Sequence, residues 1–69
     1  MPGDATAWAA AHAAALVGLP AAAAEQEVEA AGLRPRVAVP GEMLTLAHLP
    51  DRVTLVTDGA GLVTEVRPG

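Results

Sequence analysis

The hydrophobic and polar positions divide the chain into an alanine-rich half and a valine-rich half. Residues 4–32 are rich in alanine, and Trp8, His12 and Leu16 recur four residues apart, as on one face of a helix. From residue 36 on, short runs of valine and leucine alternate with polar residues, as in half-buried strands. The pattern predicts two helices followed by three strands.

The first predicted helix covers residues 4–16, "DATAWAAAHAAAL", which are strong helix formers throughout. Asp4 or Thr6 can cap the free amides at its start. Trp8, His12 and Leu16 follow one another at spacings of four and therefore share a face. We expect Trp8 and Leu16 to pack on the domain and His12 to lie at the edge.

Gly18 ends this helix, and Pro20 is suited to the first position of a second one. The second helix runs to Gly32, where a left-handed stop is expected. Its apolar stripe is narrow and consists of Ala24, Val28 and Ala31. Its polar residues are spread around the helix, which indicates a solvated face and not a metal site; they are Glu25, Gln26, Glu27 and Glu29.

Three strands are predicted, at residues 36–39, 52–57 and 62–66. "DGAG" at residues 58–61 is typical of a hairpin turn, since its residues tolerate positive φ. In the middle strand, one face carries Val53 and Leu55, and the other carries Arg52, Thr54 and Val56.

These elements predict an α+β fold: one principal helix packed on a small mixed three-stranded sheet, with a long exposed loop and an N-terminal alanine-rich helix. Composition leaves open whether the first two strands run parallel, which would need a crossover of about a dozen residues or more. The expected core consists of Leu16, Val17, Val28, Val37, Val39, Val53, Leu55, Leu62 and Val66.

The segment "PGEMLTLAHLPDRVTL" at residues 40–55 fits neither the helical nor the strand period of apolar residues. It starts with Pro-Gly and is cut by a second proline, which marks a loop. It nevertheless contains Met43, Leu44, Leu46 and Leu49. Loops are normally polar because they run over the surface, so these side chains either fold inward or are offered to a partner.

Composition excludes several classes of function. There is no cysteine for a disulfide or a thiolate metal site, and no serine or cysteine nucleophile for a catalytic triad. A net charge of −4 with four arginines lacks the basic footprint of a nucleic-acid-binding protein. No apolar run approaches the roughly 20 residues that span a bilayer. We expect no enzyme, no cofactor, no bound metal, no nucleic-acid partner and no membrane partner.

Several blocks resemble the I78 family of serine protease inhibitors, relatives of the potato inhibitor I family. They are "LVG" at residues 16–18, the loop "PGEMLTLAHLPDRV" and the ending "GLVTEVRPG". The resemblance implies one domain over residues 1–69, with a helical extension at 1–15, an inhibitor core at 16–69 and a reactive-site loop at 41–51 between two parallel strands. It implies a protease-binding set of Met43, Leu44, Thr45, Leu46, Ala47, His48 and Leu49.

By the same resemblance, Leu46 fills the primary pocket of the protease and Leu46–Ala47 is the reactive bond. Arg52 braces the loop from beneath, and Pro50 restricts its freedom. The chain departs from the family pattern at Ala47, where an acid is usual, and at Thr54, where Arg or Asn is usual. Both departures weaken the brace.

The expected partner is therefore a subtilisin-like or chymotrypsin-like serine protease, bound by a monomer. The family resemblance favours secretion after removal of a signal peptide, of which the sequence shows none. The alternative, motivated by Ala47 and Thr54, is a non-inhibitory protein-binding module on the same scaffold.

Overall fold

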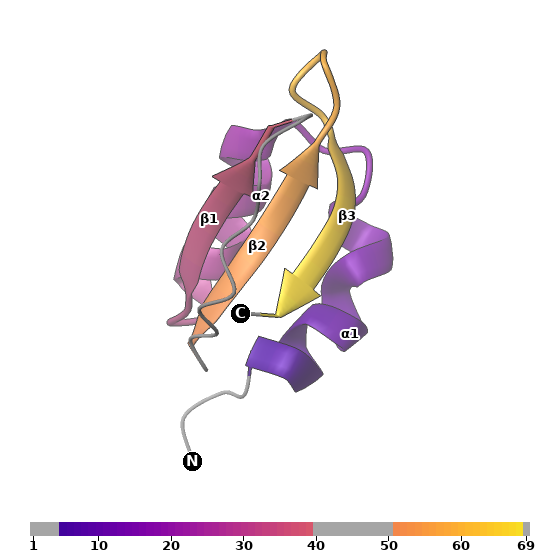
Figure 1. Cartoon of the computed structure of the whole chain (residues 1–69). Coiled ribbons are helices and arrows are strands. Elements are labelled where there is room, and N and C mark those ends of the chain that lie inside the picture. The colour runs from indigo at the N-terminus through magenta and orange to yellow at the C-terminus, as the bar shows by residue number, and fades with distance from the viewer. Residues whose placement is uncertain (1–4, 40–50, 69) are drawn as a thin grey trace.

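The computed structural model describes residues 5–39 and 51–68, which form two helices and a three-stranded sheet (Figure 1). The helices come first, α1 at Ala5–Leu16 and α2 at Ala21–Ala30. The strands follow, β1 at Arg34–Ala38, β2 at Arg52–Thr57 and β3 at Val63–Pro68. The order and type of all five elements are those predicted from the sequence, and the α+β class is confirmed.

One face of α1 packs on the domain as expected. Leu16 is buried, and Trp8 is partly buried against the core. His12 is exposed, and its Nδ1 lies 2.9 Å from the carbonyl oxygen of Trp8. The two rings stack with centroids 4.3 Å apart. His12 thus covers the outward side of the indole while the rest of Trp8 contacts the core.

The turn between the helices is fastened to the first residues of β3. Gly18 has a φ of 95°, a left-handed conformation that favours glycine. Its N–H donates to the carbonyl of Val63 at 2.7 Å, and the N–H of Val63 donates to the carbonyl of Leu19 at 2.8 Å. The end of α1 is therefore fixed relative to the sheet.

Local signals set both ends of α2. Pro20 is the N-cap, one position before the predicted one, because its ψ of 146° is extended and it forms an isolated bridge with Leu62. At the other end Gly32 has a φ of 80°, as predicted. The N–H of Leu33 donates to Val28 at 3.2 Å and that of Gly32 to Glu29 at 2.9 Å, which is a Schellman stop.

The sheet has the order β1-β2-β3, with β1 parallel to β2 and β2 antiparallel to β3. The bounds of β2 are those predicted, but β1 was predicted at residues 36–39. Pairing starts earlier because the N–H of Arg34 already donates to the carbonyl of Asp51 at 2.8 Å. Strand β3 was predicted at residues 62–66 and instead runs on to Pro68, which lies opposite Val53.

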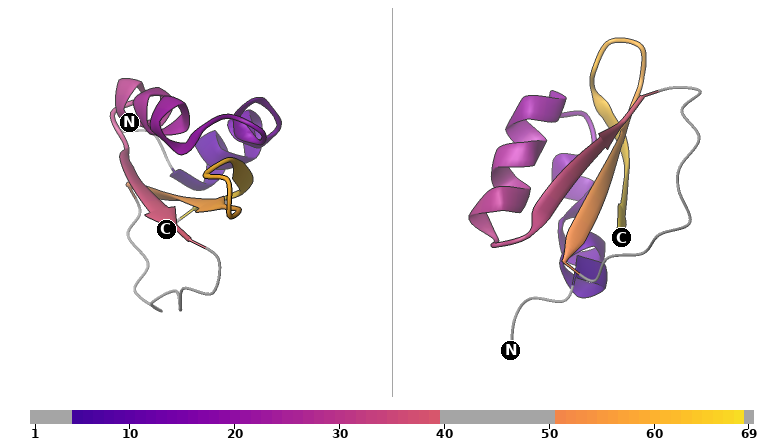
Figure 2. Two further views of the ribbon diagram at one scale, coloured as in Figure 1. Left: turned by 90° about the horizontal axis from the view of Figure 1, so that it is seen from above. Right: turned by 60° about the vertical axis from the view of Figure 1, so that its left-hand side comes forward.

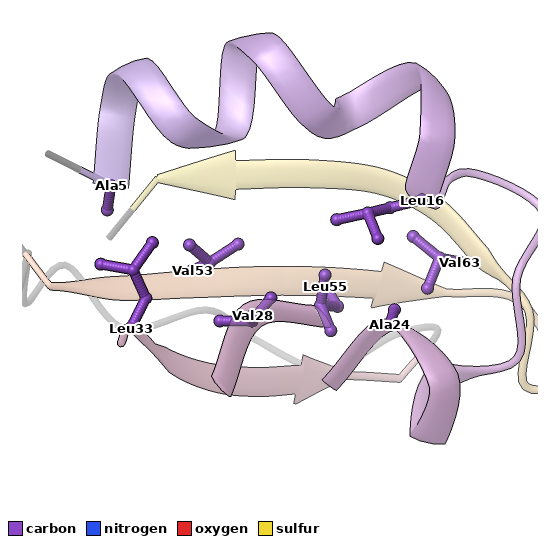
Figure 3. Close-up of a cluster of buried hydrophobic side chains, with 8 residues drawn as sticks. All are labelled: Ala5, Leu16, Ala24, Val28, Leu33, Val53, Leu55 and Val63. Atoms are coloured by element: carbon purple, nitrogen blue, oxygen red, sulfur yellow. The ribbon is translucent and has the colours of Figure 1, made fainter. Parts of the chain in front are cut away.

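Both helices cover the same face of the sheet (Figure 2), and the core lies between the two layers (Figure 3). The side chains of β2 that face the helices, Val53 and Leu55, are fully buried. The core cluster consists of Ala5, Leu16, Ala24, Val28, Leu33, Val53, Leu55 and Val63. Leu33 joins the end of α2 to this cluster, because the Schellman stop brings it back over Val28.

The predicted core is partly right. Four members are buried, Leu16, Val28, Val53 and Leu55; Val66 packs against them, and Val37 is half-buried. Three were wrong and are exposed, Val17 by 47%, Val39 by 55% and Leu62 by 37%. Each of these lies next to the end of a helix or strand: Val17 follows α1, Val39 follows β1, and Leu62 precedes β3. Ala31 is also exposed, because it is the C-cap of α2.

Val63 is buried in place of Leu62 because of an irregularity in the sheet. The pairing of β2 with β3 shifts between Val56 and Thr57, so that Thr57 lies opposite Val63. At such a shift one strand has an extra residue. Side chains on either side of it can then lie on the same face although they are an odd number of residues apart. Val63 and Val66 therefore both pack toward the helices although they are three residues apart.

Candidate functional site

The face of the sheet opposite the helices, which we call the outer face, carries the sequence-predicted bracing residues. Side chains alternate along a strand, so Arg52 and Thr54 point away from the helices that Val53 and Leu55 contact. Thr54 is only 4% exposed although no described helix covers this face. Arg52 is half-buried, and its Nε atom is shielded from solvent.

The strand register places an arginine on each side of Thr54. Thr54 pairs with Arg36 of β1 and with Arg67 of β3. Directly paired residues project from the same face, and neighbouring strands lie about 5 Å apart. Arg36, Thr54 and Arg67 thus form one row across the outer face.

All four basic residues of the chain project from the outer face. Arg34 pairs with Arg52 one row away from Arg36 and Thr54. We call this set the arginine group; it consists of Arg34, Arg36, Arg52 and Arg67. The glutamates of α2 lie on the other layer, so a chain with a net charge of −4 has a sheet face that is rich in positive charge.

Two members of the arginine group form exposed ion pairs. The Nε atom of Arg34 lies 2.9 Å from Oδ2 of Asp51, with side chains 70% and 46% exposed. Arg67 binds both carboxylate oxygens of Glu65, at 2.6 and 3.2 Å. The hydrogen bond from Arg67 holds the pKa of Glu65 below its usual value and raises the pKa of Arg67. Exposed pairs of this kind contribute little stability, so their effect is to orient the two side chains.

Arg36 and Arg52 have a different environment, because both are half-buried. A guanidinium carries five N–H donors in a fixed plane and no acceptor. Removing it from water is costly unless these donors meet acceptors. The centre of the outer face is therefore a place where half-buried guanidinium groups require hydrogen-bond acceptors.

The described residues offer little for other kinds of site. Among residues 5–39 and 51–68, no group of three or more His, Asp or Glu side chains could hold a metal ion. In the same part of the chain, neither helix has the length and apolar character needed to cross a membrane.

The sequence-predicted site residues fall into two sets. Arg52 and Thr54 are brought together on the outer face, as the alternation in the sequence predicted. The others lie outside the described residues; they are Met43, Leu44, Thr45, Leu46, Ala47, His48, Leu49 and Pro50. The expected loop at residues 41–51 lies outside them too, except for Asp51, which is half-buried and ion-paired.

Sequence reasoning missed Arg34, Arg36 and Arg67 as members of the site. Arg34 and Arg36 are two residues apart, which places them on one face of a strand. That signal could have been found. Their position beside Arg52 and Thr54 depends on the register of β1 on β2, which local sequence does not specify.

The fold defined by these elements is similar to the folds of two solved protease inhibitors. The structure is similar to bitter gourd trypsin inhibitor, with a TM-score of 0.72 and 28% identity, over 80% of this chain and 85% of that chain. It is also similar to the elastase inhibitor AFUEI, with a TM-score of 0.75 and 18% identity, over 100% of both chains. The latter likeness shows the fold alone.

Residues 9–69 match the model of the peptidase inhibitor I78 family, and the chain belongs to this family. The resemblance inferred from the sequence is thereby confirmed. The comparison with curated proteins gives no match. The family and bitter gourd trypsin inhibitor are protease inhibitors and not enzymes, and together they support protease inhibition as the activity of this chain.

Proposed function

We propose that the chain inhibits a serine protease by presenting residues 43–49 as a substrate-like segment. The observation that carries the proposal is the parallel pairing of β1 with β2. Parallel strands require a connection that returns from the carboxyl end of β1, at Ala38, to the amino end of β2, at Arg52. The helices already cover one face of the sheet (Figure 2), so the outer face with its arginine group is the face that they leave uncovered.

The connection has more chain than the return requires. Strand β1 has 5 residues, and a strand of that length spans about 16 Å. Residues 39–51 can extend by roughly 3.3 Å each. The excess is enough for the middle of the segment to stand away from the sheet and enter the cleft of a protease, while its two ends remain fixed by β1 and β2.

A braced segment turns a substrate into an inhibitor. An extended peptide pairs its backbone with the substrate-binding edge of the protease, and its alternate side chains fill pockets. If the segment is held in the bound conformation beforehand, little conformational entropy is lost on binding, and the cleaved ends stay close enough to rejoin. Arg52, half-buried on the outer face, is suited to supply this brace through its fixed donors, with Thr54 and Pro50 in supporting roles.

The target follows from the side chain at the reactive bond. Bitter gourd trypsin inhibitor and the elastase inhibitor AFUEI are named for different proteases although their folds are alike. The choice of target protease therefore depends on the side chains that the inhibitor presents and not on its scaffold. We assign Leu46 to the primary pocket and Leu46–Ala47 to the reactive bond, which favours subtilisin-like or chymotrypsin-like enzymes. We expect a monomer that forms a one-to-one complex.

Exchange of the pocket-filling side chain tests the proposal. The wild-type chain is titrated against subtilisin, chymotrypsin and trypsin, and Leu46→Lys is measured in parallel. We expect Leu46→Lys to move the preference toward trypsin, because a lysine suits the acidic pocket of trypsin-like enzymes. Val17→Lys is the matched control, since it adds the same charge at an exposed site outside the protease-binding set and should leave the ranking unchanged.

An unchanged ranking in Leu46→Lys, or an equal shift in Val17→Lys, would show that Leu46 is not the pocket-filling residue. A wild-type chain that all three enzymes neither bind nor cleave would contradict inhibition of these enzymes and favour the non-inhibitory binding module.

A further inference from the structure

The two edges of the sheet differ in what lies beside them. Strands β1 and β3 are the outer strands, so each has one side that pairs with β2 and one side that faces away from it. An unpaired strand edge can pair with another chain unless a proline, a charge or a neighbouring segment protects it. At β3 the turn between the helices occupies part of the edge, because Gly18 and Leu19 both hydrogen-bond to the backbone of Val63. No described strand pairs with the outer edge of β1.

The backbone groups of β1 alternate between the two sides of the strand. The N–H of Arg34 donates to the carbonyl of Asp51 at 2.8 Å, so Arg34 bonds toward β2. Every second residue of a strand bonds toward the same side, so Arg36 does so too. Pro35 and Val37 therefore face the open side. Proline has no backbone N–H, so this edge presents the donor of Val37 and none at Pro35.

A second copy of the chain would otherwise suit this edge. Val37 is half-buried and Val39, which follows β1, is 55% exposed, so an added strand would cover apolar surface. Two copies can pair their β1 strands antiparallel about a two-fold axis. If the axis passes beside Arg36, Pro35 of one copy lies opposite Val37 of the other. Such a pair normally exchanges two N–H···O=C bonds, and the one donated from position 35 is missing here.

We propose that Pro35 keeps the open edge of β1 from pairing with a second copy of this chain. Arg36 adds to the effect, because the same pairing places the Arg36 residues of the two copies opposite each other, where like charges are destabilising. The edge of β3 needs less protection, since the helix turn occupies it at Val63 and the strand ends at Pro68. This protection does not depend on the proposed inhibition of a protease, because it involves only β1.

A small set of chains isolates the backbone N–H at position 35. Pro35→Ala restores this donor on the open edge. The matched control is the same chain made by chemical synthesis with N-methylalanine at position 35, which has the side chain of alanine and no N–H. Pro68→Ala is a second control, because it makes the same substitution at the end of the other outer strand. If Pro35→Ala does not fold, Pro35→Thr supplies the donor on a β-branched residue suited to strands.

Sedimentation equilibrium measures the association constant of each chain, and amide hydrogen exchange of Val37, followed by NMR, shows whether the β1 edge is the contact. We expect the wild type, the N-methylated chain and Pro68→Ala to stay monomeric at concentrations at which Pro35→Ala dimerises. Each two-fold contact regains a hydrogen bond on both sides of the axis, which should raise the association constant by about tenfold or more. The Val37 amide should exchange more slowly as the concentration of Pro35→Ala rises.

The proposal is overturned if Pro35→Ala associates no more strongly than the N-methylated chain, or if Pro68→Ala associates as strongly. Association of Pro35→Ala without slower exchange at Val37 would show that the contact lies elsewhere and would overturn it too. A wild-type dimer in which the Val37 amide is protected would show that Pro35 leaves the edge open. Circular dichroism identifies the chains that are folded under these conditions, so that association of unfolded chains is not mistaken for edge pairing.

Discussion

At the scale of single residues, alanine methyl groups make up much of the contact between the two layers. Ala5 and Ala9 of α1 and Ala24 of α2 are all at most 2% exposed. Alanine loses no side-chain rotamer freedom on burial, and its small size lets backbones approach closely. A chain of 69 residues gains from both effects, because its core is small and conformational entropy opposes every buried side chain.

The pair formed by Glu65 and Arg67 gives a prediction about pH. Because Arg67 hydrogen-bonds the carboxylate, the pKa of Glu65 is lower in the folded chain than in the unfolded one. The pair therefore adds stability above the unfolded pKa, and this contribution is lost as the pH falls through the folded pKa. An NMR titration of the wild type and Arg67→Ala should show the Glu65 pKa rising toward its usual value in the variant.

High salt should weaken the same shift in the wild type, because both groups are exposed and the attraction between them is screened. A Glu65 pKa that does not change on Arg67→Ala would show that the ion pair is not populated in solution.

At the scale of helices and strands, an aspartate side chain and a glycine stabilise the turn between β2 and β3. The turn between β2 and β3 is held by Asp58, whose Oδ1 accepts from the N–H of Ala60 at 2.9 Å and of Leu62 at 3.0 Å. Gly61 supplies a φ of 82° in the same turn. The N–H of Ala21 donates to the carbonyl of Gly61 at 3.0 Å, so this turn also fixes the start of α2.

The turn yields a prediction about stability. Asp58→Ala removes the acceptor of two backbone hydrogen bonds and should lower the free energy of unfolding by about 1–2 kcal/mol, measured by urea denaturation. Asp58→Asn is the matched control, because its amide oxygen can accept the same two hydrogen bonds. It should lose less than half as much. Equal losses in the two variants would mean that the negative charge, and not the acceptor geometry, stabilises the turn.

At the scale of the whole molecule, one small core holds the chain without disulfides. Leu55 is fully buried on the central strand, between both helices and the sheet (Figure 3). Leu55→Ala should cost about 2–5 kcal/mol, a large part of the stability of so small a domain. Leu62→Ala is the same substitution at a site that is 37% exposed, and it should cost less than about 1 kcal/mol.

Urea or thermal unfolding of the two leucine variants checks this prediction. Similar losses in both would indicate that the core extends to Leu62 in solution, and no measurable loss in Leu55→Ala would contradict the two-layer packing.

The sequence by itself determined the features that depend on neighbouring residues. Runs of alanine formed the helices, Gly18 and Gly32 ended them through left-handed conformations, and "DGAG" formed the hairpin turn. Strand β2 was found at its observed bounds because its apolar and polar residues alternate cleanly. The same alternation placed Arg52 and Thr54 together on the outer face. Helix propensity, turn chemistry and strand period act over a few residues, so they can be read from the sequence alone.

Only the tertiary structure decided which surfaces meet. The exposure of Val17, Val39 and Leu62 depends on where the helix and the strands end, and the burial of Val63 depends on the shift in strand pairing near Thr57. The parallel direction of β1 and its early start at Arg34 come from hydrogen bonds to β2, which lies beyond residues 40–50. The row of Arg36, Thr54 and Arg67 exists because these contacts fix the register between strands, and a shift of one residue would place Arg36 on the opposite face.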